Sequence, residues 1–125
     1  VFPNSLQLME APHPDSEDLL FAQFKLNGYL LNAMSSTESH DFGFTPGNSL
    51  VVTCEDQEEI DYFWEKLGEN GRYDRCGWLS DRFGHSWQII PRNLGKMISD
   101  PEKGQKAMEA LMKMDKLILE KLKNP

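Results

Sequence analysis

The sequence predicts an α+β protein in which three strands and a long loop precede a strand, a helix, two further strands and a terminal helix. Two observations carry this prediction. Alternating apolar segments flank the Asn27-Gly28 pair, and apolar residues recur at helical spacing from Asp56 to Leu67 and again after Asp100. A chain of 125 residues can bury one core. We therefore expect a single domain over residues 1–125, with a helical extension from about residue 100.

The first half of the chain is predicted to be mostly β-structure. Leu20 to Leu26 alternates between the two faces of a strand, and Tyr29 to Met34 forms a second apolar segment. The Asn-Gly pair between them supplies the positive φ values of a type I′ turn, so the two segments should pair as a hairpin. Ser35 to Gly47 has no apolar period and is predicted to be a loop, of a length often found over binding sites. Ser49 to Cys54 then has the β-branched and apolar composition of a strand.

The segment from Asp56 to Leu67 has the period of an amphipathic helix. Acidic residues occupy its first turn, and Gly68 follows its last turn, as is typical of a helix end. The apolar positions fall at i, i+3, i+4 and i+7; they are Ile60, Phe63, Trp64 and Leu67. We expect Phe63, Trp64 and Leu67 to pack on the back of the sheet.

Two more strands and a terminal helix complete the predicted order. The strands are Cys76 to Ser80 and Ser86 to Ile90, joined by a turn that begins at Asp81. Asp100 at the N-cap and Pro101 at the first helical position predict a helix start. One apolar stripe follows at helical spacing: Ala107, Leu111, Met114, Ile118 and Leu122.

Composition excludes several classes of partner and compartment. A formal charge of -7 argues against nucleic acid, because binding to phosphates requires clustered Lys and Arg. No apolar run approaches the ~20 residues of a membrane span. Cys54 and Cys76 share no metal-binding or redox spacing, so we expect buried, reduced thiols. Val1 to Met9 lacks the features of a secretory signal, which favours a cytoplasmic protein. A start at Val suggests that residues upstream are missing.

A weak internal repeat relates the two halves of the chain. Gly28 and Asn32 are separated by four residues, as are Gly84 and Gln88, and each pair places a side-chain amide in a strand after a glycine turn. The second pair follows the first by 56 residues at both positions (84 minus 28 and 88 minus 32). A βαβββ unit repeated twice would produce this spacing and would place Asn32 and Gln88 at equivalent points of the last strand of each unit.

Nearly the whole chain resembles the PhnB-like domain, also named the 3-demethylubiquinone-9 3-methyltransferase domain, of the vicinal oxygen chelate (glyoxalase and bleomycin-resistance) superfamily. Three segments carry the resemblance: Cys54 to Asp61, Phe63 to Leu67, and Cys76 to Pro91 with its Trp-Leu-x-Asp-x-Phe-Gly-x-Ser-Trp-Gln string. The tail from Asp100 to Leu122 is similar to the C-terminal extension of the same family. Family members begin with a strand and a helix that precede the Val1 to Ser5 segment of this sequence.

This resemblance implies a curved mixed sheet of paired βαβββ modules with a concave cavity, the first strand and helix being absent from this sequence. It also implies a homodimer. Metal-using members of the superfamily have His or Glu on the first and last strands of each module. The corresponding positions here are Asn32, Ser49 and Gln88, and neutral amide and hydroxyl groups are poor ligands for transition metals. His13, His40 and His85 share no ligand spacing. We therefore predict no metal and no cofactor.

Strand alternation assigns Gln88 to the cavity face and Trp87 to the layer under a helix. Trp78 is either a core residue or a stacking surface for a flat ligand beside Gln88. The predicted ligand-binding set is thus Asn32, Ser49, Trp78 and Gln88.

Three functions remain open at this stage. The first is metal-free binding or sequestration of a small organic molecule, which fits the neutral polar face best. The second is a metal-dependent enzyme of glyoxalase or dioxygenase type, for which no cluster of ionisable residues is visible on the predicted face. The third is a methyltransferase, which is the least favoured because the sequence lacks a Gly-rich strand-to-helix turn. No Gly-x-Ser-x-Gly elbow indicates a catalytic triad.

Overall fold

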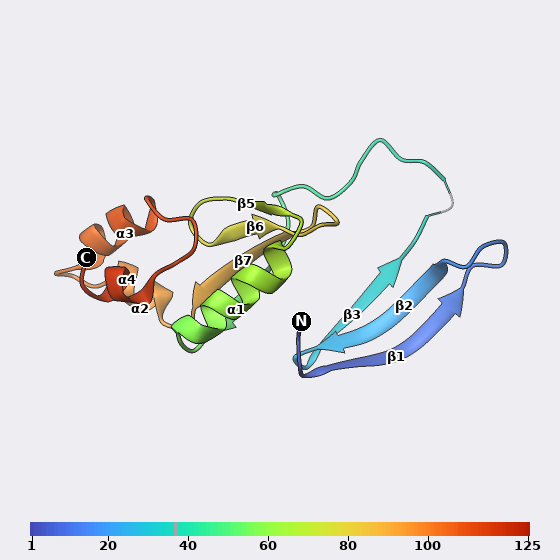
Figure 1. Cartoon of the computed structure of the whole chain (residues 1–125), viewed down its shortest axis with the longest axis horizontal. Helices are drawn as coiled ribbons and strands as arrows, with labels where there is room; N and C mark the ends of the chain where they lie inside the picture. Colours follow the sequence, from blue (N-terminus) through green and yellow to red (C-terminus); the bar gives the residue numbers. More distant parts are fainter. Residues whose placement is uncertain (37) are drawn as a thin grey trace. The chain divides into compact units, whose positions relative to one another are not determined.

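The computed structural model describes residues 1–36 and 38–125 (Figure 1). The chain divides into two compact units, Val1–Gly43 and Phe44–Pro125. We describe each unit by itself. None of the helices in the described part of the chain combines the length and apolar character needed to cross a membrane.

The first unit is an antiparallel sheet of three strands in the order β1-β2-β3. The strands are β1 (Ser5–Pro12), β2 (Leu19–Leu26) and β3 (Tyr29–Met34). Asn27 and Gly28 have φ values of 49° and 88°, the left-handed pair that a type I′ turn requires. The hairpin predicted from the Asn-Gly signal is therefore confirmed.

The second unit contains a complete βαβββ sequence of elements. Its elements are β4 (Ser49–Cys54), α1 (Gln57–Gly68), β5 (Arg72–Tyr73), β6 (Trp78–Ser80) and β7 (Ser86–Pro91). The sheet order is β4-β7-β6-β5, in which β4 and β7 are parallel and the other pairs are antiparallel. The sequence did not predict β5, because two residues are too few to show alternation.

Helix α1 begins where its capping residues predict. Asp56 has an extended backbone, and its carboxylate accepts a hydrogen bond from the Glu59 backbone N–H at 2.9 Å. The Glu59 carboxylate in turn accepts from the backbone N–H of Glu55 at 2.7 Å. These bonds satisfy backbone donors that a helix start leaves free. The predicted helix is confirmed to within one residue at each end.

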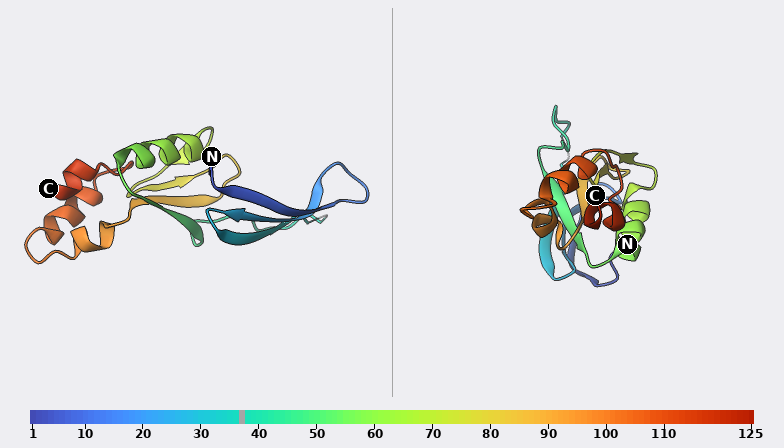
Figure 2. Two further views of the ribbon diagram at one scale, coloured as in Figure 1. Left: turned by 90° about the horizontal axis from the view of Figure 1, so that it is seen from below. Right: turned by 90° about the vertical axis from the view of Figure 1, so that its left-hand side faces the viewer.

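Helix α1 lies across one face of the four-stranded sheet (Figure 2). The Trp64 ring of α1 stacks on the Tyr73 ring of β5 at a centroid distance of 4.8 Å. A Cβ on Gly68 would lie 2.1 Å from the Tyr73 ring, so this close approach requires glycine. Tyr73 pairs with Leu79, and Leu79 pairs with Trp87. Paired residues point to the same face, so Trp87 faces α1, as predicted.

The opposite face of the sheet is more open. Ile89 on the α1 side is fully buried, whereas Val51 on the other side is 52% exposed. The register pairs Val51 with Gln88 and Val52 with Ile89, so the alternation of β4 continues across β7. We call the face opposite α1 the open face; its strand positions are Ser49, Val51, Thr53, Arg72, Trp78, Ser80, Ser86, Gln88 and Ile90.

The predicted C-terminal helical extension is present, but it is not one continuous helix. It consists of α2 (Leu94–Ile98), α3 (Gly104–Leu111) and α4 (Leu119–Lys123). Asp100 acts as a cap, since its carboxylate accepts from the backbone N–H groups of Glu102 and Lys103 in the turn before α3. The stripe residues Leu111, Met114 and Leu122 still share one buried cluster.

The interruption between α3 and α4 is caused by tertiary hydrogen bonds. The backbone N–H groups of Cys76 and Gly77 donate to the carbonyl oxygens of Met114 and Asp115, both at 2.8 Å. These carbonyls are therefore used outside the helix. The fully buried Leu117 side chain lies against the position that a Cβ of Gly77 would occupy.

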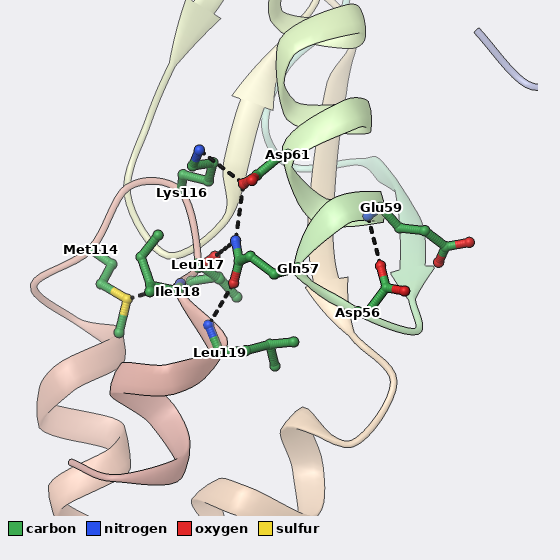
Figure 3. A network of polar contacts seen from close by, with 9 residues as sticks. All are labelled: Asp56, Gln57, Glu59, Asp61, Met114, Lys116, Leu117, Ile118 and Leu119. Atoms are coloured by element: carbon green, nitrogen blue, oxygen red, sulfur yellow. Dashed lines mark hydrogen bonds and ion pairs between the residues drawn. The ribbon is translucent and has the colours of Figure 1, made fainter.

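Gln57 of α1 fixes the same C-terminal segment (Figure 3). Its side-chain N–H donates to the Leu117 carbonyl at 3.0 Å, and its side-chain oxygen accepts from the Leu119 N–H at 2.8 Å. Gln57 also donates to Asp61, which forms an ion pair with Lys116 at 2.9 Å. The Gln57 and Lys116 contacts hold the pKa of the Asp61 carboxyl below its usual value.

The two cysteines are free thiols in different surroundings. Cys54 is fully buried at the end of β4, as predicted, whereas Cys76 is only partly buried. Burial first, and then the nearby carboxylates of Glu59, Asp56 and Glu55, raise the pKa of the Cys54 thiol to about 12.

Candidate ligand-binding face

Three of the four predicted site residues lie together on the open face. Ser49 is at the start of β4, Trp78 begins β6, and Gln88 is in the middle of β7. Because β7 lies between β4 and β6, it brings residues distant in sequence onto one surface. Asn32 lies in β3 of the first unit.

A hydrogen bond joins Ser49 and Gln88. The Gln88 side-chain N–H donates to the Ser49 hydroxyl oxygen at 2.9 Å. In the parallel register Ser49 pairs with Ser86, so Gln88 reaches diagonally by two residues along the same face. Both side chains are half-buried. The bond restrains the rotation of the Gln88 amide and fixes the direction in which its remaining groups point.

Trp78 is the direct antiparallel partner of Gln88. Directly paired residues have Cβ atoms roughly 5 Å apart, so the two side chains leave the backbone side by side on the open face. Trp78 is half-buried. Part of this side chain therefore faces solvent, as a stacking surface requires.

Asn32 has a comparable amide environment in the first unit. Gln23 of β2 donates to the Asn32 side-chain oxygen at 3.1 Å, and the two residues are paired in register. Gly28 before β3 and Gly84 before β7 have φ values of 88° and 85°. The glycine turn, the following strand and the amide of the predicted repeat are therefore present in both units.

Asp81 organises the β6–β7 turn. One carboxylate oxygen accepts from the backbone N–H groups of Phe83 and His85 at 2.9 and 3.0 Å. The other accepts from the Trp87 indole N–H at 2.9 Å. Asp81 therefore caps the turn that the sequence predicts to begin there, and its contact with Trp87 is a feature that sequence analysis missed. A carboxylate engaged in three hydrogen bonds serves to position the turn.

His85 is a second feature that the sequence did not single out as buried. Its ring makes edge-on contacts with Phe44 and Trp87, at centroid distances of 5.0 and 5.3 Å. Among the described residues, the His85 Nδ1 atom alone is a buried side-chain N or O atom without a hydrogen-bond partner. Two aromatic neighbours explain why this histidine is partly buried rather than on the surface.

The residues at the predicted ligand positions do not fit a transition metal. Ser49 and Gln88 are neutral and bond to each other, whereas such metals prefer imidazole, carboxylate or thiolate ligands. Within residues 1–36 and 38–125, no group of three or more His, Cys, Asp or Glu side chains could hold a metal ion. We therefore derive no chemistry through a metal.

Two open hollows are lined by other residues, one in each unit. One, of about 550 Å³, is lined by Lys106, Glu109, Ala110, Lys113, Met114, Lys121 and Pro125. The other, of about 350 Å³, follows β1 and β2 and is lined by Ser5, Leu6, Gln7, Phe24, Lys25 and Leu26. Neither hollow includes Ser49, Trp78 or Gln88. A concave cavity around these three residues stays a prediction.

Comparison with known proteins gives the family of the chain. The family model described as 3-demethylubiquinone-9 3-methyltransferase matches residues 3–90. A solved PhnB protein from Bacillus cereus, which carries the same methyltransferase name, is 32% identical, with a TM-score of 0.68 over 72% of this chain and 81% of that chain.

A second solved protein, from Pseudomonas aeruginosa, is 18% identical, with a TM-score of 0.55 over 65% of this chain and 68% of that chain. At this identity the likeness concerns the fold alone. No curated protein matches the chain. The match to the family model and the likeness to the Bacillus cereus protein show that this chain belongs to the PhnB-like family.

Proposed function

We propose that the protein binds a small organic molecule on the open face without the help of a metal. The observation that carries this proposal is the cluster of Ser49, Trp78 and Gln88, which combines an oriented amide with an aromatic surface. Binding sites typically pair apolar or aromatic area with a few placed polar groups. We propose that Asn32, the equivalent amide of the first unit, contributes to the same function.

A catalytic role has less support. The open-face positions of β4, β6 and β7 carry no ionisable residue, and the one on β5, Arg72, is a guanidinium paired with Asp74, so no general acid or base stands beside the Gln88 amide. Methyl transfer, which the family name suggests, requires a bound methyl donor. The link from β4 to α1 is Glu55-Asp56, without the glycines of a nucleotide-binding turn. Binding or sequestration is therefore the proposed function.

Mass spectrometry of the purified protein tests this proposal. Small molecules released by denaturation should include an organic compound near one equivalent, and metal analysis of the same sample should find none. Trp78→Ala should lose the compound, while Thr53→Ala, at the far end of the same face of β4, should keep it. Nickel, zinc or iron near one equivalent after mild dialysis would favour the metal-dependent enzyme instead.

We also propose that the protein works as a homodimer in the cytoplasm. Two free cysteines suit a reducing compartment. In the first unit both outer strands expose large apolar side chains, including Leu6, Tyr29 and Met34. Exposed strand edges and apolar patches favour association with another chain, and a symmetric dimer is the commonest assembly.

A further inference from the structure

The open face retains hydrogen-bonding groups that the protein does not use. A glutamine amide has two N–H donors and a carbonyl oxygen, and Gln88 uses one donor, toward Ser49. In the described part of the chain only His85 has a buried side-chain polar atom without a partner. The unused carbonyl and N–H of Gln88, and the Trp78 indole N–H, are therefore open to solvent or to a ligand.

After donating to Ser49, the Gln88 amide keeps a carbonyl acceptor and one N–H donor on neighbouring atoms. This edge is complementary to a ligand that has a donor next to an acceptor, which is how glutamine forms paired hydrogen bonds with an adenine edge. Ser49 strengthens the preference for such a ligand, because its hydrogen bond holds the Gln88 amide in one orientation. An amide that is already oriented loses less conformational entropy on binding.

The surroundings of the amide select against charge. The strand positions of the open face on β4, β6 and β7 are all uncharged. On the short edge strand β5, Arg72 forms an ion pair with Asp74 at 3.1 Å. Arg72 lies on the same face through its pairing with Ser80, but Asp74 already neutralises its charge. A charged ligand beside Gln88 would therefore meet no unpaired opposite charge on these four strands.

Trp78 adds a flat surface beside this edge. It is paired directly with Gln88, it is only half-buried, and indole rings stack readily on planar rings. A planar ligand lying on Trp78 would bring its own edge toward the Gln88 amide.

We infer that the ligand class is an uncharged planar heterocycle with an N–H donor next to an acceptor, as in a cyclic amide or an aminoheterocycle. This inference rests on the proposed binding function and narrows it. These two ligand types present the same arrangement of a donor next to an acceptor. A lactam has an N–H donor and a C=O acceptor, and an aminoheterocycle has an N–H donor and a ring-nitrogen acceptor.

Titration of the full 125-residue chain, followed by NMR of the tryptophan indole N–H signals, tests the inference. The probes are isocarbostyril for the lactam, adenine for the aminoheterocycle, and N-methylisocarbostyril, which is planar but lacks the donor. The Trp78 signal is assigned with Trp78→Phe. At least one of the two probes that carry an N–H donor should shift the Trp78 signal. If isocarbostyril shifts this signal, its N-methyl derivative should bind at least about tenfold more weakly.

Variants of Gln88 locate the selectivity. Gln88→Leu should abolish the difference between isocarbostyril and its N-methyl derivative. Gln88→Glu removes the donor but keeps an acceptor, so it should weaken both probes through the lost bond to the lactam carbonyl and retain the preference for the unmethylated probe. Thr53→Ala should leave the difference unchanged. The same spectra report whether each variant is folded.

The outcomes separate this inference from the proposed function. Equal binding of the methylated and unmethylated probes would overturn the inference and leave binding at the open face intact. Release of a charged organic compound from the purified protein would do the same. If no probe shifts Trp78 and the purified protein retains no compound, both proposals fail.

Discussion

At the scale of single residues, Cys54 and Cys76 differ in their expected reactivity. The thiolate is the reactive form of cysteine, and the Cys54 pKa of about 12 leaves almost none of it near neutral pH. We expect iodoacetamide at pH 8 to label Cys76 alone in the folded protein and both cysteines in urea. Equal labelling rates in the folded protein would contradict the burial of Cys54.

The same thiol predicts how stability changes at high pH. The ordinary pKa is 9.0 and the folded value is about 12. Because folding raises this pKa, the contribution of the neutral thiol to the free energy of unfolding is complete below pH 9 and is lost as the pH rises toward 12. Cys54→Ala should show a smaller loss between these pH values than the parent protein in urea titrations, measured beside Cys76→Ala as the matched control.

At the scale of secondary-structure elements, α1 is held on the sheet by Trp64. This side chain is buried and stacks on Tyr73. Truncating a buried tryptophan leaves a large cavity, so Trp64→Ala should lower the free energy of unfolding by about 3 to 5 kcal/mol. Urea denaturation measures this change, with the exposed Glu65→Ala as the control. An unchanged midpoint for Trp64→Ala would mean that the helix face is wrongly assigned.

The link between α1 and the C-terminal segment depends on Gln57. Replacing Gln57 with Leu removes the partners of the Leu117 carbonyl and the Leu119 N–H. An unpaired buried donor or acceptor typically lowers the free energy of unfolding by about 1 to 3 kcal/mol, and we expect a loss in this range for Gln57→Leu. Glu58→Gln, one residue along the same helix, should change stability by no more than about 0.5 kcal/mol.

Gln57→Leu also has a readout that a general loss of stability would not give. The Gln57 hydrogen bond is the main cause of the lowered Asp61 pKa. In the variant this pKa should rise toward its ordinary value, as followed by NMR titration of the carboxyl group. An unshifted Asp61 pKa would show that the contact in Figure 3 is absent in solution.

At the scale of the whole molecule, the proposed homodimer should dissociate on dilution. If its contacts involve the exposed apolar residues of the first unit, Leu6→Lys combined with Leu8→Lys should weaken association by adding charge at an edge strand. Sedimentation velocity over a wide concentration range measures this, with Lys96→Gln as the control. A folded monomer at every concentration would refute the dimer.

The candidate site was predictable in part. The family resemblance marked Ser49 and Gln88, and strand alternation placed Gln88 on the predicted cavity face with Trp78 beside it. The structure brings these three residues together. The hydrogen bond between Ser49 and Gln88 was not predictable, because it depends on β4 and β7 pairing in parallel across a separation of 39 residues. Periodicity reports which face a side chain occupies, but it does not report which strands are neighbours.

The sequence by itself determined the elements that depend on local interactions. The Asn27-Gly28 turn, the cap of α1 at Asp56 and the strand Ser49–Cys54 all follow from turn chemistry, capping and period. Tertiary structure decided the rest. The helical stripe after Gly104 is interrupted because Cys76, Gly77 and Gln57 bind the backbone of residues 114–119, and hydrogen bonds between distant segments override local helix propensity.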